Sequence, residues 1–145
     1  MKLASIALAL LALAAAGCGD DDEEETEAPT KDEFVVEADK ICVDADETLA
    51  EVALEQYPEG PPTGEDAVAF AEDVFTPNLQ GQHDDLAALT PPEGEEDAFA
   101  DVLEQLQAGI DEIAGDPENF VRTDALEDAS AAAADFGLQT CEFEN

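Results

Sequence analysis

The three cysteines are the residues whose chemistry the sequence indicates most directly. Cys18 follows Ala15, Ala16 and Gly17, the small residues that precede a lipid-modified cysteine at the end of an export signal. The thiol of such a cysteine receives a diacylglyceryl group, and the residue becomes the mature N-terminus after cleavage. We therefore expect residues 1–17 to be a lipoprotein signal peptide and Cys18 to be the lipid anchor. An ordinary secretory signal, in which Cys18 stands by chance, is the alternative.

The residues before Cys18 have the charge and length of an export signal. Lys2 supplies a positive charge, and an apolar run from Leu3 to Ala14 follows it. This run is shorter than the roughly 20 apolar residues that span a bilayer, so we expect a removable signal. The predicted location is the cell membrane, with the protein lipid-anchored on the extracytoplasmic face.

Two cysteines remain, Cys42 in a predicted helix and Cys141 near the end of the sequence. Exported domains fold in an oxidising setting, and two cysteines allow a single intramolecular pairing. They lack the Cys-x-x-Cys spacing of redox and metal sites. We therefore predict a structural disulfide between Cys42 and Cys141, which closes a loop worth about 4–5 kcal/mol in the chain-entropy model.

Groups suited to catalysis are scarce in this sequence. His83 is the only histidine, and the polar residues around it predict a solvated helix face more readily than a general base or a zinc ligand. Ser130 stands in an alanine-rich segment without the Gly-x-Ser-x-Gly turn of hydrolases. We expect no enzymatic activity, no catalytic residue and no cofactor.

Carboxylates dominate the composition: 39 acidic residues against four basic ones give a net charge of −35. Such a charge repels nucleic acid, which we exclude as a partner. Asp44, Asp46, Thr48 and Glu55 match some positions of a calcium-binding loop, but Leu49 stands where that loop requires glycine. We interpret this stretch as a solvated helix face and assign no metal site, and diffuse cation binding follows from the charge alone.

The composition divides the chain into three parts. Residues 1–17 are the predicted signal, residues 18–31 form an acidic tether without a large apolar side chain, and residues 32–145 form the folded domain. We expect the tether to be disordered and extended by its like charges. The domain is long enough for one modest core.

Apolar residues at spacings of three and four predict the fold class. They indicate four helices. The first covers residues 32–57, and the second runs from Thr63 to about residue 89 with a kink near Pro77. The third follows Thr90 and ends at Gly115, and the fourth covers residues 124–136. We expect capping boxes to open the second helix at Thr63 and the third at Thr90. No run of alternating β-branched residues occurs. The prediction is an all-α, up-and-down bundle of about four helices, closed by the disulfide.

Several short stretches resemble a known group of proteins. They are Phe34 with residues 38–42, residues 86–92, and residues 136–138 with Cys141. In these stretches, which span most of residues 32–141, the chain resembles small uncharacterised actinobacterial lipoproteins. The resemblance implies an envelope location, a helical domain and the cysteine pair, and it carries no activity and no functional residue.

Two hypotheses of function follow. The first is a lipid-anchored interaction or binding module of the cell envelope, whose partner is an envelope protein or a small ligand. The alternative is a divalent-cation-binding or metal-responsive envelope protein. An exposed apolar patch favours the first hypothesis, and a converging cluster of acidic side chains favours the second.

Overall fold

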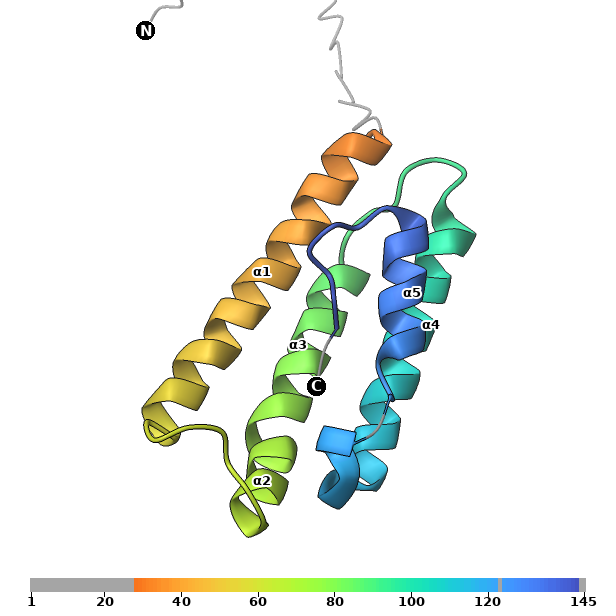
Figure 1. The fold of residues 1–145 in the computed structure, drawn as a ribbon. Coiled ribbons are helices and arrows are strands. Elements are labelled where there is room, and N and C mark those ends of the chain that lie inside the picture. The colour runs from red at the N-terminus through yellow and green to blue at the C-terminus, as the bar shows by residue number, and fades with distance from the viewer. Residues whose placement is uncertain (1–27, 123, 144–145) are drawn as a thin grey trace, which may run out of the picture.

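The computed structural model describes residues 28–122 and 124–143, and over these ranges the chain forms an all-helical, up-and-down bundle without strands (Figure 1). The elements are α1 (Lys31–Gln56), α2 (Glu65–Phe70), η1 (Ala71–Phe75), α3 (Thr76–Ala87), α4 (Glu96–Gly115), η2 (Pro117–Arg122) and α5 (Glu127–Phe136). Because α2, η1 and α3 follow one another without a break, they form one rod, and the predicted four-helix bundle is confirmed. The predicted signal peptide, Cys18 and the tether up to residue 27 lie outside the described residues. No helix of the described part has the length and apolar character needed to cross a membrane.

The first helix begins slightly before the expected domain boundary at Asp32. Thr30 is its N-cap, and its hydroxyl accepts a hydrogen bond from the Glu33 backbone N–H while the Thr30 backbone N–H donates to the Glu33 carboxylate at 3.0 Å. The Thr30 hydroxyl also donates to this carboxylate, and these bonds lower the pKa of Glu33. Lys31 lies with Nζ 2.7 Å from Glu95 Oε2 and 3.4 Å from the ring centre of Phe136. The last residues of the expected tether therefore belong to the bundle.

The two predicted capping boxes at Thr63 and Thr90 are wrong. The second rod begins at Glu65 after Gly64, which has φ +62° and makes no side-chain cap. Such a backbone conformation interrupts a helical start at Thr63. The third rod begins only at Glu96, because the residues after Thr90 are two prolines followed by Gly94 at φ +85°. If Thr90 were the N-cap, Pro91 would be the first helical residue, and Pro92 disfavours the helical conformation of the residue before it, so α4 does not start there.

Just before Pro77, where the sequence predicts a kink, the helix contains a π-helical turn. Over Ala71–Phe75 the helix widens, and the Thr76 backbone N–H donates to the carbonyl of Ala71, five residues earlier. Pro77 has no N–H to donate, and its ring crowds the carbonyl of Asp73 in a regular α-helix. The wider turn places this residue at the start of α3 while the apolar phase continues through Ala71, Phe75, Leu79 and Leu86, all of which are buried.

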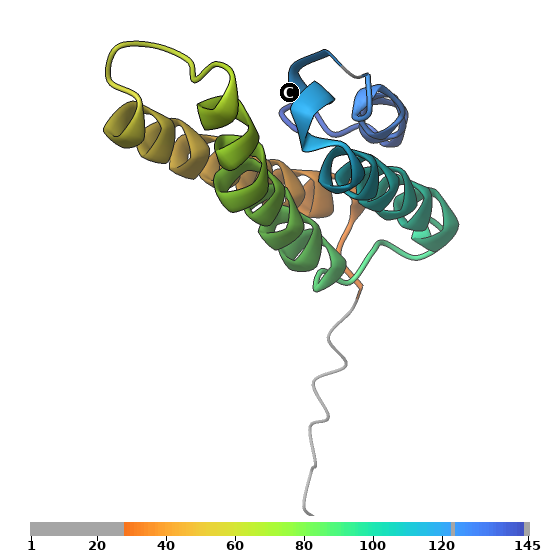
Figure 2. The same cartoon turned by 90° about the horizontal axis from the view of Figure 1, so that it is seen from below.

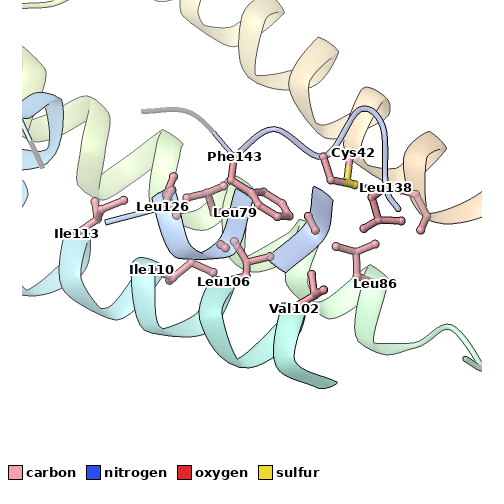
Figure 3. Close-up of a cluster of buried hydrophobic side chains, with 14 of the residues drawn as sticks. Cys42, Leu79, Leu86, Val102, Leu106, Ile110, Ile113, Leu126, Leu138 and Phe143 are labelled. Atoms are coloured by element: carbon pink, nitrogen blue, oxygen red, sulfur yellow. Dashed lines mark hydrogen bonds between the residues drawn. A yellow bond between two sulfur atoms is a disulfide. The ribbon is translucent and has the colours of Figure 1, made fainter. Parts of the chain in front are cut away.

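The core is built around α4, which packs against both α3 and α5. The apolar stripe predicted for this helix is buried at Phe99, Val102, Leu106, Ile110 and Ile113 and partly buried at Leu103. The residues predicted to face inward from the last helix, Leu126, Ala129, Ala133 and Phe136, are all buried. Figure 3 shows the side chains that converge from α3, α4, α5 and the C-terminal segment: Leu79, Leu86, Val102, Leu106, Ile110, Leu126, Leu138 and Phe143. Gly109 of α4 faces the start of α5, where a Cβ atom would lie 2.5 Å from the carbonyl oxygen of Ala125. The absence of a side chain at this position allows the two helices to approach closely.

Three phenylalanines connect α1 to α4 and α5. The ring of Phe34 lies 4.7 Å from that of Phe99 and 5.6 Å from that of Phe136, and the latter two lie 5.4 Å apart. Lys31 covers this cluster through its contact with Phe136. The two contacts of Phe34 are edge-to-face, and such contacts each add about 0.5–1.5 kcal/mol beyond the area that they bury.

The C-terminal segment closes the bundle on the side between α1 and α5 (Figure 1). As predicted, α5 ends at Gly137, whose φ of +106° turns the chain back. Residues 138–143 then run along the bundle, with Leu138 and Phe143 buried. The predicted disulfide between Cys42 and Cys141 is present, with the two Cα atoms 5.2 Å apart.

Hydrogen bonds reinforce this closure beside the disulfide. The Asp39 carboxylate oxygen Oδ1 accepts from the backbone N–H groups of Gln139 and Thr140 at 2.8 and 3.1 Å. The Thr140 hydroxyl donates to the Asp39 carbonyl oxygen at 3.0 Å. The Ser130 hydroxyl donates to the carbonyl oxygen of Phe143 at 3.0 Å. The segment is therefore attached at both of its ends.

Removal of the disulfide should destabilise the protein strongly. In the Cys42→Ala/Cys141→Ala variant, the unfolded chain regains the freedom of a loop with a sequence separation of 99. We expect the free energy of unfolding to fall by about 2–5 kcal/mol, measured by urea denaturation. Chemical reduction of the unmutated protein controls for the lost packing of the sulfur atoms and should give a similar loss. A loss below about 1 kcal/mol in both cases contradicts this account.

A side chain at position 109 should separate α4 from α5. We expect Gly109→Ala to lower the free energy of unfolding by about 1–3 kcal/mol, because the new methyl group overlaps the backbone of Ala125. Gly81→Ala is the matched control, since this helical glycine has nothing within 4 Å of the added Cβ. The control should raise stability by about 0.5–1 kcal/mol through helix propensity. Equal effects of the two substitutions would argue against the close contact.

Candidate functional site

His83 and Ser130 are the residues considered for catalysis, and the side chains of both make contacts that support the fold. His83 lies on α3 with Nδ1 3.2 Å from Oδ1 of Asp84, and its side chain is 18% exposed. Gln80 donates to the same carboxylate at 3.0 Å. The hydrogen bond from Gln80 has the larger effect in lowering the pKa of Asp84, and the contact with His83 lowers it further. Gln80 also reaches the side-chain oxygen of Gln107 on α4 at 3.4 Å. The histidine thus belongs to a polar connection between two helices, and the hydroxyl of Ser130 holds the C-terminal segment.

The acidic residues of the calcium-loop pattern lie along one unbroken helix. The stretch from Asp44 to Glu55 is entirely within α1, so the loop does not form. Lys40 forms an ion pair with the exposed Asp44 carboxylate, which raises the pKa of the lysine. Within residues 28–122 and 124–143, no three His, Cys, Asp or Glu side chains lie together in a way that could hold a metal ion. The converging acidic cluster that favours a cation-binding function is therefore missing from this part of the chain.

The outer side of α1 carries a line of exposed apolar side chains. Val36, Val43 and Leu54 are 71%, 38% and 70% exposed. Their separations of 7 and 11 residues place them within about 20° of one another at 100° per residue. We call these three residues the outer line. Their common spacing is visible in the sequence, but whether another element covers this side of α1 depends on the tertiary structure.

Acidic residues border the outer line on both sides. Helical periodicity places Glu33 and Glu51 along one side of it and Asp32 and Asp46 along the other, with Glu47 inside it. Lys40 is the basic residue nearest to the line in the helix, and it already pairs with an aspartate. This side of the protein therefore combines apolar contact area with strong negative potential.

The outer line ends in an apolar hollow of about 480 Å³. The hollow lies where α1 gives way to the loop over residues 57–64, at the end of the bundle opposite to the first described residue, Ala28 (Figure 1). Its lining residues are Ala53, Leu54, Tyr57, Pro58, Glu59, Gly60, Pro61, Pro62 and Phe70. The volume is within the range of about 300–1,000 Å³ that is typical of ligand-binding pockets.

Aromatic packing holds the hollow in shape. The ring of Tyr57 lies 5.8 Å from that of Phe70, which lies 6.4 Å from that of Phe75. Phe120 of η2 extends this cluster toward the core, with its ring 5.6 Å from that of Phe75. The Tyr57 hydroxyl donates to the Asp66 carbonyl oxygen at 3.4 Å. Together with the three prolines of the rim, these contacts make a preformed hollow, which limits the entropy lost on binding.

A second, more polar groove of about 280 Å³ lies between α1 and α3. It is lined by Ile41, Asp44, Ala45, Thr48, Pro77, Asn78, Gly81, Gln82 and Asp85. The side-chain amide of Asn78 crosses it and donates to the carbonyl oxygen of Ala45 at 3.1 Å. Neither this groove nor the hollow was predicted from the sequence, because each depends on how separate helices are placed.

Monovalent salt should stabilise this protein, because the net charge of −35 opposes the compact state. The described ion pairs are few: Lys31 with Glu95, Lys40 with Asp44, and His83 with Asp84. We expect the melting temperature to rise as NaCl shortens the Debye length from about 30 Å at 0.01 M to about 3 Å at 1 M.

CaCl₂ and MgCl₂ at matched ionic strength are the controls for specific cation binding. At equal ionic strength, each of these salts should raise the melting temperature about as much as NaCl does. A selective rise at micromolar concentration of one metal would contradict this expectation, since ligand binding stabilises the native state by RT ln(1 + [L]/Kd).

Comparisons with known proteins gave no match among family models, curated proteins or solved structures.

Proposed function

We propose that this protein is a lipid-anchored interaction module on the extracytoplasmic face of the cell membrane, and that it binds a basic, partly apolar segment of another envelope protein. The observation that carries the proposal is the preformed apolar hollow, which is continuous with the exposed Leu54. Solvent-exposed apolar surface of this kind is costly in water unless a partner covers it.

The charge of the surroundings identifies the occupant. Glu51, Glu55 and Glu59 lie in or beside the hollow, so a partner that brings apolar side chains must also carry positive charge. An amphipathic segment with Leu or aromatic anchors flanked by Lys or Arg satisfies both conditions. A second copy of this chain is a poor occupant, because each copy has a net charge of −35.

The position of the hollow suits a membrane-anchored receptor. With Cys18 lipidated, the chain enters the bundle at the N-terminal end of α1, and the hollow lies at the C-terminal end of this helix. The 26 residues of α1 span about 39 Å at 1.5 Å per residue. The hollow is then at the end of α1 remote from the point where the anchored chain enters the bundle, which leaves it accessible to a segment of a neighbouring envelope protein.

A charge placed at position 54 should weaken this binding. The probe is a synthetic amphipathic helix of leucine and lysine, and its dissociation constant is measured by fluorescence anisotropy at fixed ionic strength. We expect Leu54→Glu to weaken binding about tenfold or more, because the substitution removes an apolar contact and buries a carboxylate in the complex.

Ala100→Glu is the matched control, because it adds the same charge at an exposed position of α4. It should change the dissociation constant by less than about twofold. Equal effects at positions 54 and 100 would show that the peptide responds only to bulk charge. Cross-linking from position 54 to a second copy of the chain would also overturn the proposal.

A further inference from the structure

Gln82 is the one buried polar residue in the part of the chain that the structure describes. It is only 4% exposed and stands between Leu79 and Leu86 on the core-facing side of α3. An apolar side chain is the ordinary choice at such a position, since burial of an amide costs free energy unless the amide is hydrogen-bonded. The presence of glutamine here therefore requires an explanation.

The side-chain amide of Gln82 makes no hydrogen bond to any described residue. It is nevertheless not sealed inside the core, because Thr76 Oγ1 is the sole side-chain N or O atom of the described residues that is both fully buried and unpaired. The amide thus retains access to solvent, and the space that Gln82 lines is the groove between α1 and α3. An unpaired amide at the floor of a groove is suited to receive a ligand.

The walls of the groove offer further hydrogen-bond acceptors. The Thr48 hydroxyl donates its proton to the carbonyl oxygen of Asp44 at 2.8 Å, which leaves the lone pairs of the hydroxyl free. The amide nitrogen of Asn78 is bonded to the Ala45 carbonyl, which leaves its side-chain oxygen. The groove is therefore rich in oxygen atoms that accept hydrogen bonds.

Charge selects among the ligands that this groove could take. Asp85 stands on the α3 wall without a described ion pair, Asp44 stands on the α1 wall and is paired with Lys40, and no residue of the lining is basic. An anion is repelled by these carboxylates. A tightly held calcium ion takes 6–8 oxygen ligands, typically with several carboxylates, and the described residues offer no group of three acidic, His or Cys side chains. The volume of about 280 Å³ is also several times the roughly 30 Å³ share of one water molecule.

We propose that the groove between α1 and α3 is a binding site for an ammonium group, with the amide oxygen of Gln82 and the Asp85 carboxylate as its acceptors. An ammonium has three donors and one positive charge, which match an acceptor-rich, acidic groove. The protein already shows this pairing at the edge of the groove, where the Lys40 ammonium binds Asp44. This site is separate from the hollow, so the proposal does not depend on the proposed function.

The test follows the side-chain amide signal of Gln82 by NMR while the purified protein is titrated at constant ionic strength. 1,4-Diaminobutane represents free amines, and Nα-acetyl-lysine methylamide represents the lysine side chain of a protein. We expect a saturable shift of the Gln82 signal with at least one probe. The probe that binds more tightly identifies the source of the ammonium, and CaCl₂ at equal ionic strength serves as the metal control.

Two substitutions of equal charge separate the site from general attraction. Asp85→Asn should weaken binding about fivefold, as expected for one charge-assisted contact, and Asp73→Asn, on η1 outside the groove, should have less than about a twofold effect. Equal effects of the two variants overturn the proposal, as does a Gln82 signal that shifts more strongly with calcium than with either amine.

Gln82→Leu provides an independent readout. This substitution removes an unpaired amide and keeps the size of the side chain, so we expect the melting temperature to rise while the binding of the amine is lost. A fall in the melting temperature would mean that the amide supports the fold, and unchanged binding in this variant would mean that the amide contacts no ligand. Either result overturns the proposal.

Discussion

The attachment of the C-terminal segment to α1 is the constraint on which the rest of the structure depends. α1 packs along α3 and reaches α4 and α5 through Phe34. Cys42 lies on the same buried side of α1 as Phe34, and its disulfide and the hydrogen bonds of Asp39 hold residues 138–143 against this helix. Figure 2 shows α1 running beside α3. Because α1 carries the outer line and one wall each of the hollow and the groove, its fixed position determines the shape of these sites.

The charge of the chain explains why such a closure is needed. With a net charge of −35, every compact arrangement brings carboxylates closer together. The described ion pairs are exposed or partly exposed, and such pairs contribute only about 0–1 kcal/mol each. The apolar core and the covalent closure must therefore offset the repulsion. The acidity also limits partners, since a surface of this kind attracts basic groups whether they belong to a peptide or to a small amine.

The sequence predicted those elements whose signal is local and uninterrupted. The stripe of α4 has regular spacing from Phe99 to Ile113, so its helix and inward face followed from this period. Its end followed from Gly115 and from Pro117, which comes shortly after it. The cysteine pair followed from elimination. The predicted helix starts at Thr63 and Thr90 were wrong. A capping pattern considers only residue types, and it does not account for the backbone angles that the following glycines and prolines adopt.

Features that depend on distant parts of the chain were not predicted. Leu138 and Phe143 are buried, yet their segment has no period, and only the path of the chain after Gly137 brings them to the core. The hollow arises where a helix end, a proline-rich loop and Phe70 meet, which no single stretch of sequence specifies. Gln82 has the helical spacing of the buried residues of α3, but a polar side chain is not expected in a core, so its burial was not predicted.

The disulfide has a mechanical consequence. Cys42 lies near the start of the described chain and Cys141 near its end, so the bond connects the two ends of the molecule by a short covalent route. A tensile force between these ends passes from the first turns of α1 through the two sulfur atoms to the C-terminal residues. The chain between the cysteines, which forms most of the bundle, carries none of this load. Pulling on the ends can strip the first turns of α1, but it cannot unravel the interior while the bond is intact.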